Sequence, residues 1–135
     1  MVGRTLEDIR KAVNVGYTRH TGIDITAVGE GFAEGNIVIT DKHTNPFGMV
    51  HGGVSFCLGD VLGGAAFRTL GGLPVTLSSN ATYMRPLRNT DIIYGRAEVI
   101  KHGKTTSVVE TKIFNAQMIE CVRIEAVYYN VEERI

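Results

Sequence analysis

Residues 51–70 read HGGVSFCLGDVLGGAAFRTL, an apolar, helix-like run inside an otherwise strand-rich chain. From Gly53 onward, apolar side chains recur at spacings of three and four, the pattern of a helix that buries one face. They are Val54, Cys57, Leu58, Val61, Leu62 and Ala65. Glycines at positions 59, 63 and 64 each weaken such a helix by about 1 kcal/mol relative to alanine. We therefore expect surrounding structure to hold this helix over residues 53–70, with another backbone or a ligand approaching it closely.

The elements around this central helix are mostly strands. Thr5 is a candidate N-cap for an amphipathic helix over residues 6–19, which Gly22 would end. A strand is expected over residues 31–40, followed by a loop over residues 41–49 that is rich in Asp, Asn, Pro and Gly. Four strand-like runs follow the central helix: 75–86, 92–101, 105–114 and 118–129. One curved antiparallel sheet wrapped around the helix, an α+β architecture, would bury it.

Composition and charge indicate an ordinary globular domain. The 135 residues are 44% apolar and 21% charged, which predicts one domain over residues 1–135, with residues 1–24 as an N-terminal helix and lead-in. The 14 basic and 14 acidic side chains cancel, which argues against nucleic acid or an anionic membrane as partner. The apolar run 54–67 is shorter than the ~20 residues of a membrane span, and the charged segment MVGRTLEDIR leads us to expect no signal peptide. We expect a cytoplasmic protein whose Cys57 and Cys121 are buried and reduced.

The start of the central helix is a candidate site for an oxygen atom. The first turn of a helix leaves backbone N–H groups unsatisfied, and the helix dipole makes that end partially positive. Because Gly52 and Gly53 carry no side chain, a substrate oxygen could approach their N–H groups directly. This suits a carbonyl oxygen that gains negative charge during nucleophilic attack. The alternative is a tight turn that requires the conformational freedom of glycine.

Asp60 is the second unusual residue of this helix. Its neighbours at helical spacing are Phe56, Cys57, Gly63 and Gly64, so no cation on the same helix can pair with it. An unpaired carboxylate in an apolar setting is a stronger base, although an aspartate that reaches solvent or caps another element is the alternative.

The spacing between these two features has a consequence for assembly. Gly52 and Asp60 are eight residues apart, which corresponds to ~12 Å along a helix. One substrate carbon cannot contact both groups of the same chain. If they act together, Asp60 must come from a neighbouring subunit, which requires at least a homodimer with sites at its interface.

Other polar residues are weaker candidates. Asn45 could hold a water or a carbonyl, or be a turn residue, and His51 could be a ligand, a base or an orienting group. No second His, Cys or carboxylate stands at zinc-like spacing from His51, and His43, eight residues earlier, is a weak partner, so no metal site is expected. Four cations could contact a nucleotide phosphate, with solvated surface charge as the alternative for each: Arg85, Arg88, Lys101 and Lys104.

The spaced motifs resemble those of a known family. The segments NPFGMVHGGVSFCLGD (45–60) and VTLSSNATYMRPL (75–87) resemble hotdog-fold acyl-CoA thioesterases of the phenylacetate-degradation (PaaI-like) branch. The shared pattern is an Asn, a His-Gly-Gly six residues later, an acidic residue nine after the His, and a strand with Asn-x-x-Tyr-x-x-Pro. Here these are Asn45, His51–Gly53, Asp60 and Asn80–Pro86, and the resemblance covers roughly residues 25–130.

The resemblance implies a hotdog fold, a sheet of five to six strands around the central helix, and a role for each matching residue. Gly52 would polarise the thioester carbonyl, with His51 orienting that end of the helix. Asp60 of the partner subunit would act as general base or nucleophile, and Asn45 would position the water or the substrate. Thr76, four residues before the strand asparagine, would assist the carboxylate.

Further expectations concern substrate contacts and assembly. Gly53 and Asn80 are expected to contact substrate, and strict alternation would place Asn80 on one polar face with Thr76, Ser78 and Thr82. The resemblance implies acyl-CoA as substrate, no cofactor, and a homodimer that pairs again into a tetramer.

Hydrolysis of an acyl-CoA thioester is the leading hypothesis. One alternative is an enoyl-CoA hydratase or dehydratase on the same fold, whose usual Asp-x-x-x-x-His pair is missing after Asp60. The other is an acyl-CoA-binding protein without turnover.

Overall fold

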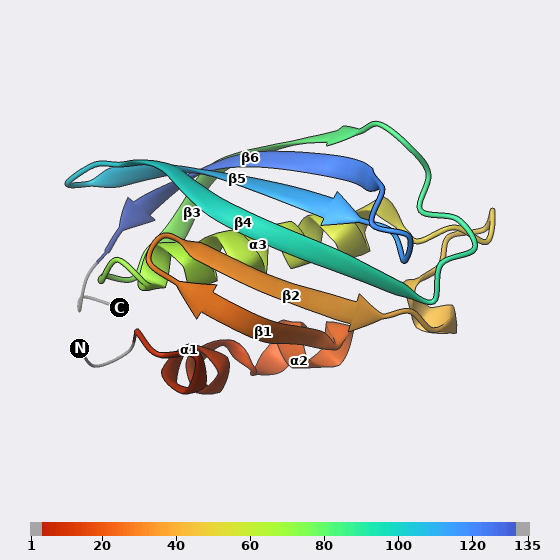
Figure 1. Ribbon diagram of the computed structural model, residues 1–135, viewed down its shortest axis with the longest axis horizontal. Helices are drawn as coiled ribbons and strands as arrows, with labels where there is room; N and C mark the ends of the chain where they lie inside the picture. The colour runs from red at the N-terminus through yellow and green to blue at the C-terminus, as the bar shows by residue number, and fades with distance from the viewer. Residues whose placement is uncertain (1–3, 132–135) are drawn as a thin grey trace.

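Six strands form one antiparallel sheet that curls around a single long helix (Figure 1). The computed structural model describes residues 4–131, so positions 1–3 and 132–135 of the predicted domain lie outside it. The strand order is β1-β2-β4-β5-β6-β3. In chain order the elements are α1 (Leu6–Val13), α2 (Gly16–Thr21), β1 (Ile23–Gly29), β2 (Phe32–Val38), the 3-10 turn η1 (Asp41–His43), α3 (Gly52–Arg68), β3 (Pro74–Tyr83), β4 (Ile92–His102), β5 (Thr106–Phe114) and β6 (Glu120–Asn130).

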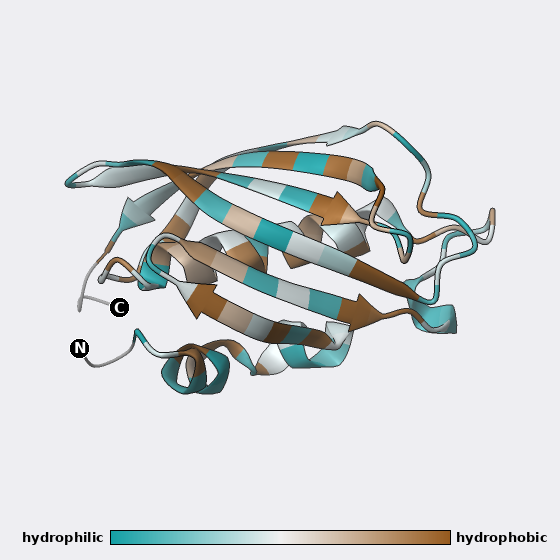
Figure 2. Cartoon of the chain, viewed as in Figure 1, coloured by the Kyte–Doolittle hydropathy of each residue, from teal (hydrophilic) through white to brown (hydrophobic). Residues whose placement is uncertain are grey.

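The core lies between α3 and the concave face of the sheet. Along the strands hydrophobic residues alternate with hydrophilic ones (Figure 2), because successive side chains point to opposite faces. Leu58 and Leu62 of α3 are fully buried against sheet residues such as Ile93. The glycines of α3 permit this packing: a methyl group at Gly59 would collide with Ile124, and one at Gly63 with the Tyr128 hydroxyl. At Gly59 and Gly63 the close approach is therefore made by side chains of β6, which corrects the expectation of another backbone or a ligand.

The N-terminal region differs from the predicted single helix over residues 6–19. Thr5 caps α1 by accepting the Asp8 N–H at 3.1 Å, as expected, but α1 ends at Val13. Asn14 leaves the helical conformation, and Gly16 adopts a φ of +50°, which a continuous right-handed helix does not allow. The chain restarts as α2, which Gly22 ends in the left-handed conformation, as predicted.

A strand that the sequence analysis did not identify follows α2. β1 pairs with β2 along its length and buries Ile23 and Ile25. Buried and exposed residues alternate in β1 only as far as Ile25. The register then shifts, with Thr26 as an extra residue. With β1 the sheet has six strands, the upper number that the family resemblance implied. The α+β hotdog architecture is confirmed.

The sheet leaves one side of α3 open, between its two edge strands β1 and β3. The helices α1 and α2 lie along β1 and reach α3, so they cover part of this side (Figure 1). Among the described residues β3 pairs only with β6, and several apolar side chains on or just after it are exposed: Val75, Leu77, Tyr83 and Met84.

No helix within residues 4–131 combines the length and the apolar character that crossing a bilayer requires.

Candidate active site

The two glycines at the N-terminus of α3 differ in the hydrogen bonds of their N–H groups. His51 is the N-cap, and its ring Nδ1 accepts the Gly53 N–H at 2.8 Å. The Val54 N–H donates to the His51 carbonyl at 2.9 Å. The Gly52 N–H, in contrast, donates to no group of residues 4–131. The free donor of this helix end is therefore the Gly52 N–H, while His51 occupies the N–H of Gly53.

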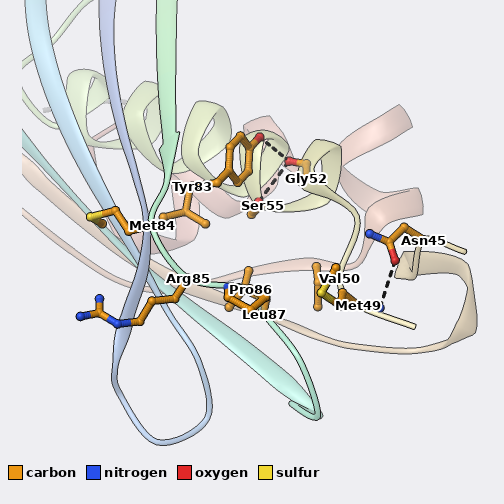
Figure 3. A pocket seen from close by; sticks show the side chains of 11 residues that line it. Asn45, Met49, Val50, Gly52, Ser55, Tyr83, Met84, Arg85, Pro86 and Leu87 are labelled. Atoms are coloured by element: carbon orange, nitrogen blue, oxygen red, sulfur yellow. Dashed lines mark hydrogen bonds between the residues drawn. The ribbon is translucent and has the colours of Figure 1, made fainter. Parts of the chain in front are cut away.

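Two hydroxyl groups hold the peptide that follows this donor. Tyr83 and Ser55 donate to the Gly52 carbonyl at 2.8 and 3.1 Å (Figure 3). A Cβ at Gly52 would stand 3.2 Å from the Tyr83 ring, which is closer than most carbon contacts. The Tyr83 ring therefore packs against the α-carbon of position 52 and favours glycine there. Sequence reasoning placed Tyr83 in a motif but gave it no role.

Asn45 lies in the loop before α3, and its side-chain amide is held in one orientation. Its Oδ1 accepts the N–H groups of Phe47 and Met49 at 3.0 and 3.1 Å, so this loop is an Asx turn. Because two donors fix the oxygen side of the amide, the Nδ2 group is its free end. Asn45 therefore offers a second N–H donor that no group of residues 4–131 accepts.

Asn45 and Gly52 line one pocket of about 240 Å³, here called the Gly52 pocket (Figure 3). Its remaining lining is largely apolar and comes from the loop, from α3, from the segment around the end of β3 and from β6: Met49, Val50, Ser55, Tyr83, Met84, Arg85, Pro86, Leu87 and Val122. Arg85 lines this pocket while donating to the Glu120 carbonyl at 2.8 Å, and Arg88 lies 3.5 Å from the Met49 sulfur.

A buried histidine fixes the loop that carries Asn45. His43 accepts the Thr40 N–H at 2.9 Å through Nδ1, which leaves Nε2 to donate to the Thr21 carbonyl at 2.7 Å. Since Thr21 is the last residue of α2, His43 links η1 to the N-terminal helices. Sequence reasoning weighed His43 only as a weak metal partner of His51. Within residues 4–131, no group of three His, Cys, Asp or Glu side chains could hold a metal ion.

Asp60 lies two turns further along α3, half-buried on its open side. Its Oδ1 accepts the Thr76 hydroxyl at 2.7 Å, and Tyr128 donates to the Asp60 carbonyl at 2.9 Å. Burial and the Asp60 charge raise the pKa of Tyr128 far above its usual range, so this phenol remains a hydrogen-bond donor. Oδ2 of Asp60 accepts no hydrogen bond from residues 4–131. The carboxylate is thus oriented through one oxygen and open at the other.

Asp60 lines a second cavity of about 190 Å³, here called the Asp60 cavity. The N-terminal helices and the last turns of α3 supply much of its wall, which sequence reasoning missed because only the folded chain brings these segments together. Its lining is Ala12, Val13, Thr18, Asp60, Val61, Gly64, Arg68, Pro74, Thr76 and Tyr128. None of these residues lines the Gly52 pocket. A single chain therefore keeps Gly52 and Asp60 in separate cavities.

Cys57, one turn before Asp60, is only half-buried, which corrects the expectation of a buried thiol; Cys121 is buried as expected. Both are free thiols. Burial raises the pKa of the Cys57 thiol; a hydrogen bond with Thr21 opposes this rise, and the Asp60 charge adds to it. A thiol that stays protonated is a poor nucleophile.

A bulge in β3 separates Thr76 from Asn80. Thr76 pairs with Tyr128 and Ser78 with Val127, so Leu77 is an extra residue in β3. Beyond it, Ser79 and Ala81 lie half-buried opposite Ala126 and Ile124, while Asn80 is exposed opposite Glu125. The expected polar face with Thr76, Ser78, Asn80 and Thr82 is therefore wrong. Thr76 faces Asp60, and Asn80 faces away from it.

The four candidate phosphate contacts lie in two groups. Arg85 and Arg88 follow β3 beside the Gly52 pocket. Lys101 and Lys104 belong to the β4–β5 hairpin, at the left of Figure 1, whereas the loop before α3 lies at the right. One chain does not bring these cations together.

Comparison with known proteins places this geometry in a family. The family model described as the thioesterase superfamily matches residues 47–122, more than half of the chain. The acyl-coenzyme A thioesterase PaaI of Escherichia coli is 32% identical over 96 residues, which cover 71% of this chain and 69% of that protein.

Solved structures agree with this match. The crystal structure of a Haemophilus influenzae thioesterase has a TM-score of 0.86 at 28% identity, covering 98% of this chain and 96% of that one. The structure of E. coli PaaI, from the phenylacetic acid degradation operon, has a TM-score of 0.87 at 25% identity, covering 97% and 96%. This chain belongs to the thioesterase superfamily, with the hotdog fold and the PaaI-like character that its sequence predicted.

Proposed function

We propose that this protein hydrolyses an acyl-CoA thioester to a carboxylic acid and CoA, in sites shared between two subunits. Its family makes it a thioester hydrolase, and the E. coli relative is named an acyl-coenzyme A thioesterase. The observation that carries the proposal is the free Gly52 N–H, which lines a pocket with Asn45 while the oriented Asp60 carboxylate lies in another cavity. The chemistry described below requires no cofactor.

The Gly52 pocket supplies the electrophilic half of the site. Attack on a thioester carbonyl places negative charge on its oxygen, and preorganised N–H donors stabilise that charge. The Gly52 N–H is such a donor at the positive end of α3, and the Asn45 Nδ2 group can position the same carbonyl or the attacking water. His51 contributes indirectly, because it caps Gly53 and so holds the first turn of α3.

Asp60 supplies the basic half. With Oδ1 held by Thr76, the open Oδ2 can take a proton from a water molecule as its oxygen attacks the carbonyl carbon. The tetrahedral intermediate then collapses, the carbon–sulfur bond breaks, and the CoA thiolate leaves and is protonated. Direct attack by the carboxylate, followed by hydrolysis of the anhydride, would give the same products.

Pairing of two subunits through the free edge of β3 would bring the two halves of the site together. Thr76 of β3 contacts Asp60, and Tyr83 at the other end of β3 contacts Gly52. If two copies pair antiparallel through β3, with the two-fold axis near Ser79, Thr76 faces the partner's Tyr83. Asp60 then lies beside the partner's Gly52. The same pairing would protect an exposed edge strand and its apolar side chains.

Such a dimer would also combine the separated cations. Arg85 and Arg88 of one subunit lie at the Gly52 end, and Lys101 and Lys104 lie beyond the Asp60 end of the other. We propose that they contribute to binding the CoA phosphates and that dimers pair again into tetramers. The hydratase alternative has less support, since no histidine lines the Asp60 cavity.

A thiol-release assay over a panel of acyl-CoA thioesters tests the proposal. The wild-type protein should release CoA from at least one of them, and Asp60→Asn should lower kcat by about 100-fold or more, as expected when a general base is lost. An Asp60→Asn protein that retains wild-type rates on every thioester would show that Asp60 has no such role. Binding without any thiol release would favour the non-catalytic alternative.

A further inference from the structure

Arg68 lines the Asp60 cavity without any partner in the described chain. It is the last residue of α3 and is half-buried. The four ion pairs of residues 4–131 all use other arginines, and no hydrogen bond joins the Arg68 side chain to these residues. Burial lowers the pKa of its guanidinium, and no acidic side chain among the described residues opposes the effect.

The position of Arg68 at the end of α3 explains why a cation is favourable there, but not why its side chain is half-buried without a partner among the described residues. A cation in the last turn of a helix is stabilised by the free carbonyl groups there. That effect is available to a side chain fully in water, whereas Arg68 turns into a cavity and loses part of its hydration. A partly desolvated cation costs free energy unless an anion pairs with it. The planar guanidinium matches a carboxylate or a phosphate in geometry.

The rest of the cavity fits a small apolar body. Apart from Asp60, Arg68 and three hydroxyl groups, its wall is made by Ala12, Val13, Val61, Gly64 and Pro74. Its volume is about 190 Å³, and an apolar cavity of about 150 Å³ is large enough for benzene. An acyl group with a short chain or a single ring would therefore occupy it.

Distance determines which part of the substrate can reach Arg68. Asp60 and Arg68 are eight residues apart on α3, which is ~12 Å between their α-carbons. Long helical side chains point back toward the helix N-terminus, so the guanidinium is closer to Asp60 than this. In CoA the whole pantetheine arm separates the thioester from the nearest phosphate, so an extended arm carries its phosphates beyond this span. An anion at the end of a short acyl group lies within it.

We propose that the Asp60 cavity is the acyl subsite and that Arg68 binds a carboxylate at the far end of the acyl group. This rests on the proposed hydrolase function and names its substrate class: CoA monothioesters of short dicarboxylic acids, or aromatic acyl groups that carry a carboxylate. The thioester lies at Asp60 and the partner's Gly52, and the acyl chain runs along α3 toward Arg68.

Adipyl-CoA and hexanoyl-CoA form a matched pair for the test, because they have equally long chains and differ only at the terminal group. We expect the wild-type protein to favour adipyl-CoA in kcat/KM by about 10- to 100-fold, the range for a charge-assisted pair. Arg68→Gln should abolish this preference by lowering only the adipyl-CoA value. Arg68→Lys should retain part of it, since it keeps the charge but loses the planar fork. Thermal unfolding of each variant checks that the fold is intact.

Three outcomes separate the proposal from its rivals. An adipyl-to-hexanoyl ratio that Arg68→Gln leaves unchanged would refute the acyl subsite, even if both thioesters are hydrolysed. If Arg68→Gln weakens both CoA esters equally but leaves the phosphate-free N-acetylcysteamine thioesters unaffected, Arg68 binds a CoA phosphate and the acyl assignment is wrong. Equilibrium binding to Asp60→Asn protein gives a readout without turnover. A preference for adipyl-CoA there that disappears in the Asp60→Asn, Arg68→Gln double variant supports the subsite, even if the proposed hydrolysis fails.

Discussion

The Gly52 N–H can be removed without removing the helix that presents it. Gly52 is the first residue of α3, where proline is well tolerated because its missing N–H has no helical partner. The preceding residue, His51, has φ −60° and ψ 135°, an extended conformation that a following proline accepts. Gly52→Pro therefore removes the proposed donor and leaves the backbone of α3 in place.

Gly52→Ala is the matched control, because it adds a Cβ and keeps the N–H. Both variants place a Cβ at 3.2 Å from the Tyr83 ring. The Tyr83 ring, 52% exposed in the single chain, has to shift by only a few tenths of an ångström in either variant. The steric cost is thus largely shared, and the difference between the two variants reports on the N–H group.

Loss of one oxyanion donor lowers kcat by about 100- to 1,000-fold, or roughly 3–4 kcal/mol in the activation free energy. We expect Gly52→Ala to keep kcat within about 10-fold of wild type and Gly52→Pro to fall below it by this larger factor. The measurement is steady-state thiol release on the best acyl-CoA, with circular dichroism and thermal unfolding to compare the folds. Equal kcat values for two folded variants would show that the Gly52 N–H does not stabilise the transition state.

Three further substitutions test side chains that orient Asp60 or stabilise the fold around the site. Thr76→Val should lower kcat by about 10-fold or more by releasing the Asp60 carboxylate, and Thr76→Ser should retain most of the rate; a valine variant at wild-type rate would contradict the orienting role. Tyr128→Phe addresses pH: because its folded-state pKa is raised, Tyr128 stabilises the fold below about pH 10, and this contribution is lost as the pH rises further. Urea unfolding should therefore show the wild type losing stability above pH 10 faster than Tyr128→Phe, and parallel curves would refute this. His43→Leu should cost roughly 2 kcal/mol or more in the free energy of unfolding, because the Thr40 N–H and the Thr21 carbonyl lose a buried partner; an unchanged urea midpoint would count against this.

The central helix and the separation of its two candidate site residues were predictable because they depend on local pattern. Apolar spacing identified α3, and the fixed rise per residue separated Gly52 from Asp60 without any tertiary information. The strands after α3 were found for the same reason. β1 was missed because its alternation is short and becomes irregular after Ile25, where the strand carries its own register shift.

Features that depend on tertiary contacts were not predictable in this way. The bulge at Leu77 moves Asn80 to the other face of β3, and an alternating pattern of Thr, Ser and Asn gives no sign of it. Which glycine N–H remains free depends on how the His51 ring turns back onto Gly53. Ala12 and Val13 line the Asp60 cavity only because the N-terminal helices pack against the open side of α3. In each case the decisive partner is set by folding rather than by neighbours in sequence.

The shared site can be tested by mixing two inactive variants. Gly52→Pro lacks the donor and Asp60→Asn lacks the base, so neither homodimer has a complete site. If each site combines Gly52 of one subunit with Asp60 of the other, a mixed dimer contains one site with both groups intact. After subunits are exchanged at equal amounts, half of the dimers are mixed, and we predict thiol release at roughly a quarter of the wild-type rate. A mixture of well-folded, exchanged subunits that stays as inactive as its two components would contradict a site built from two chains.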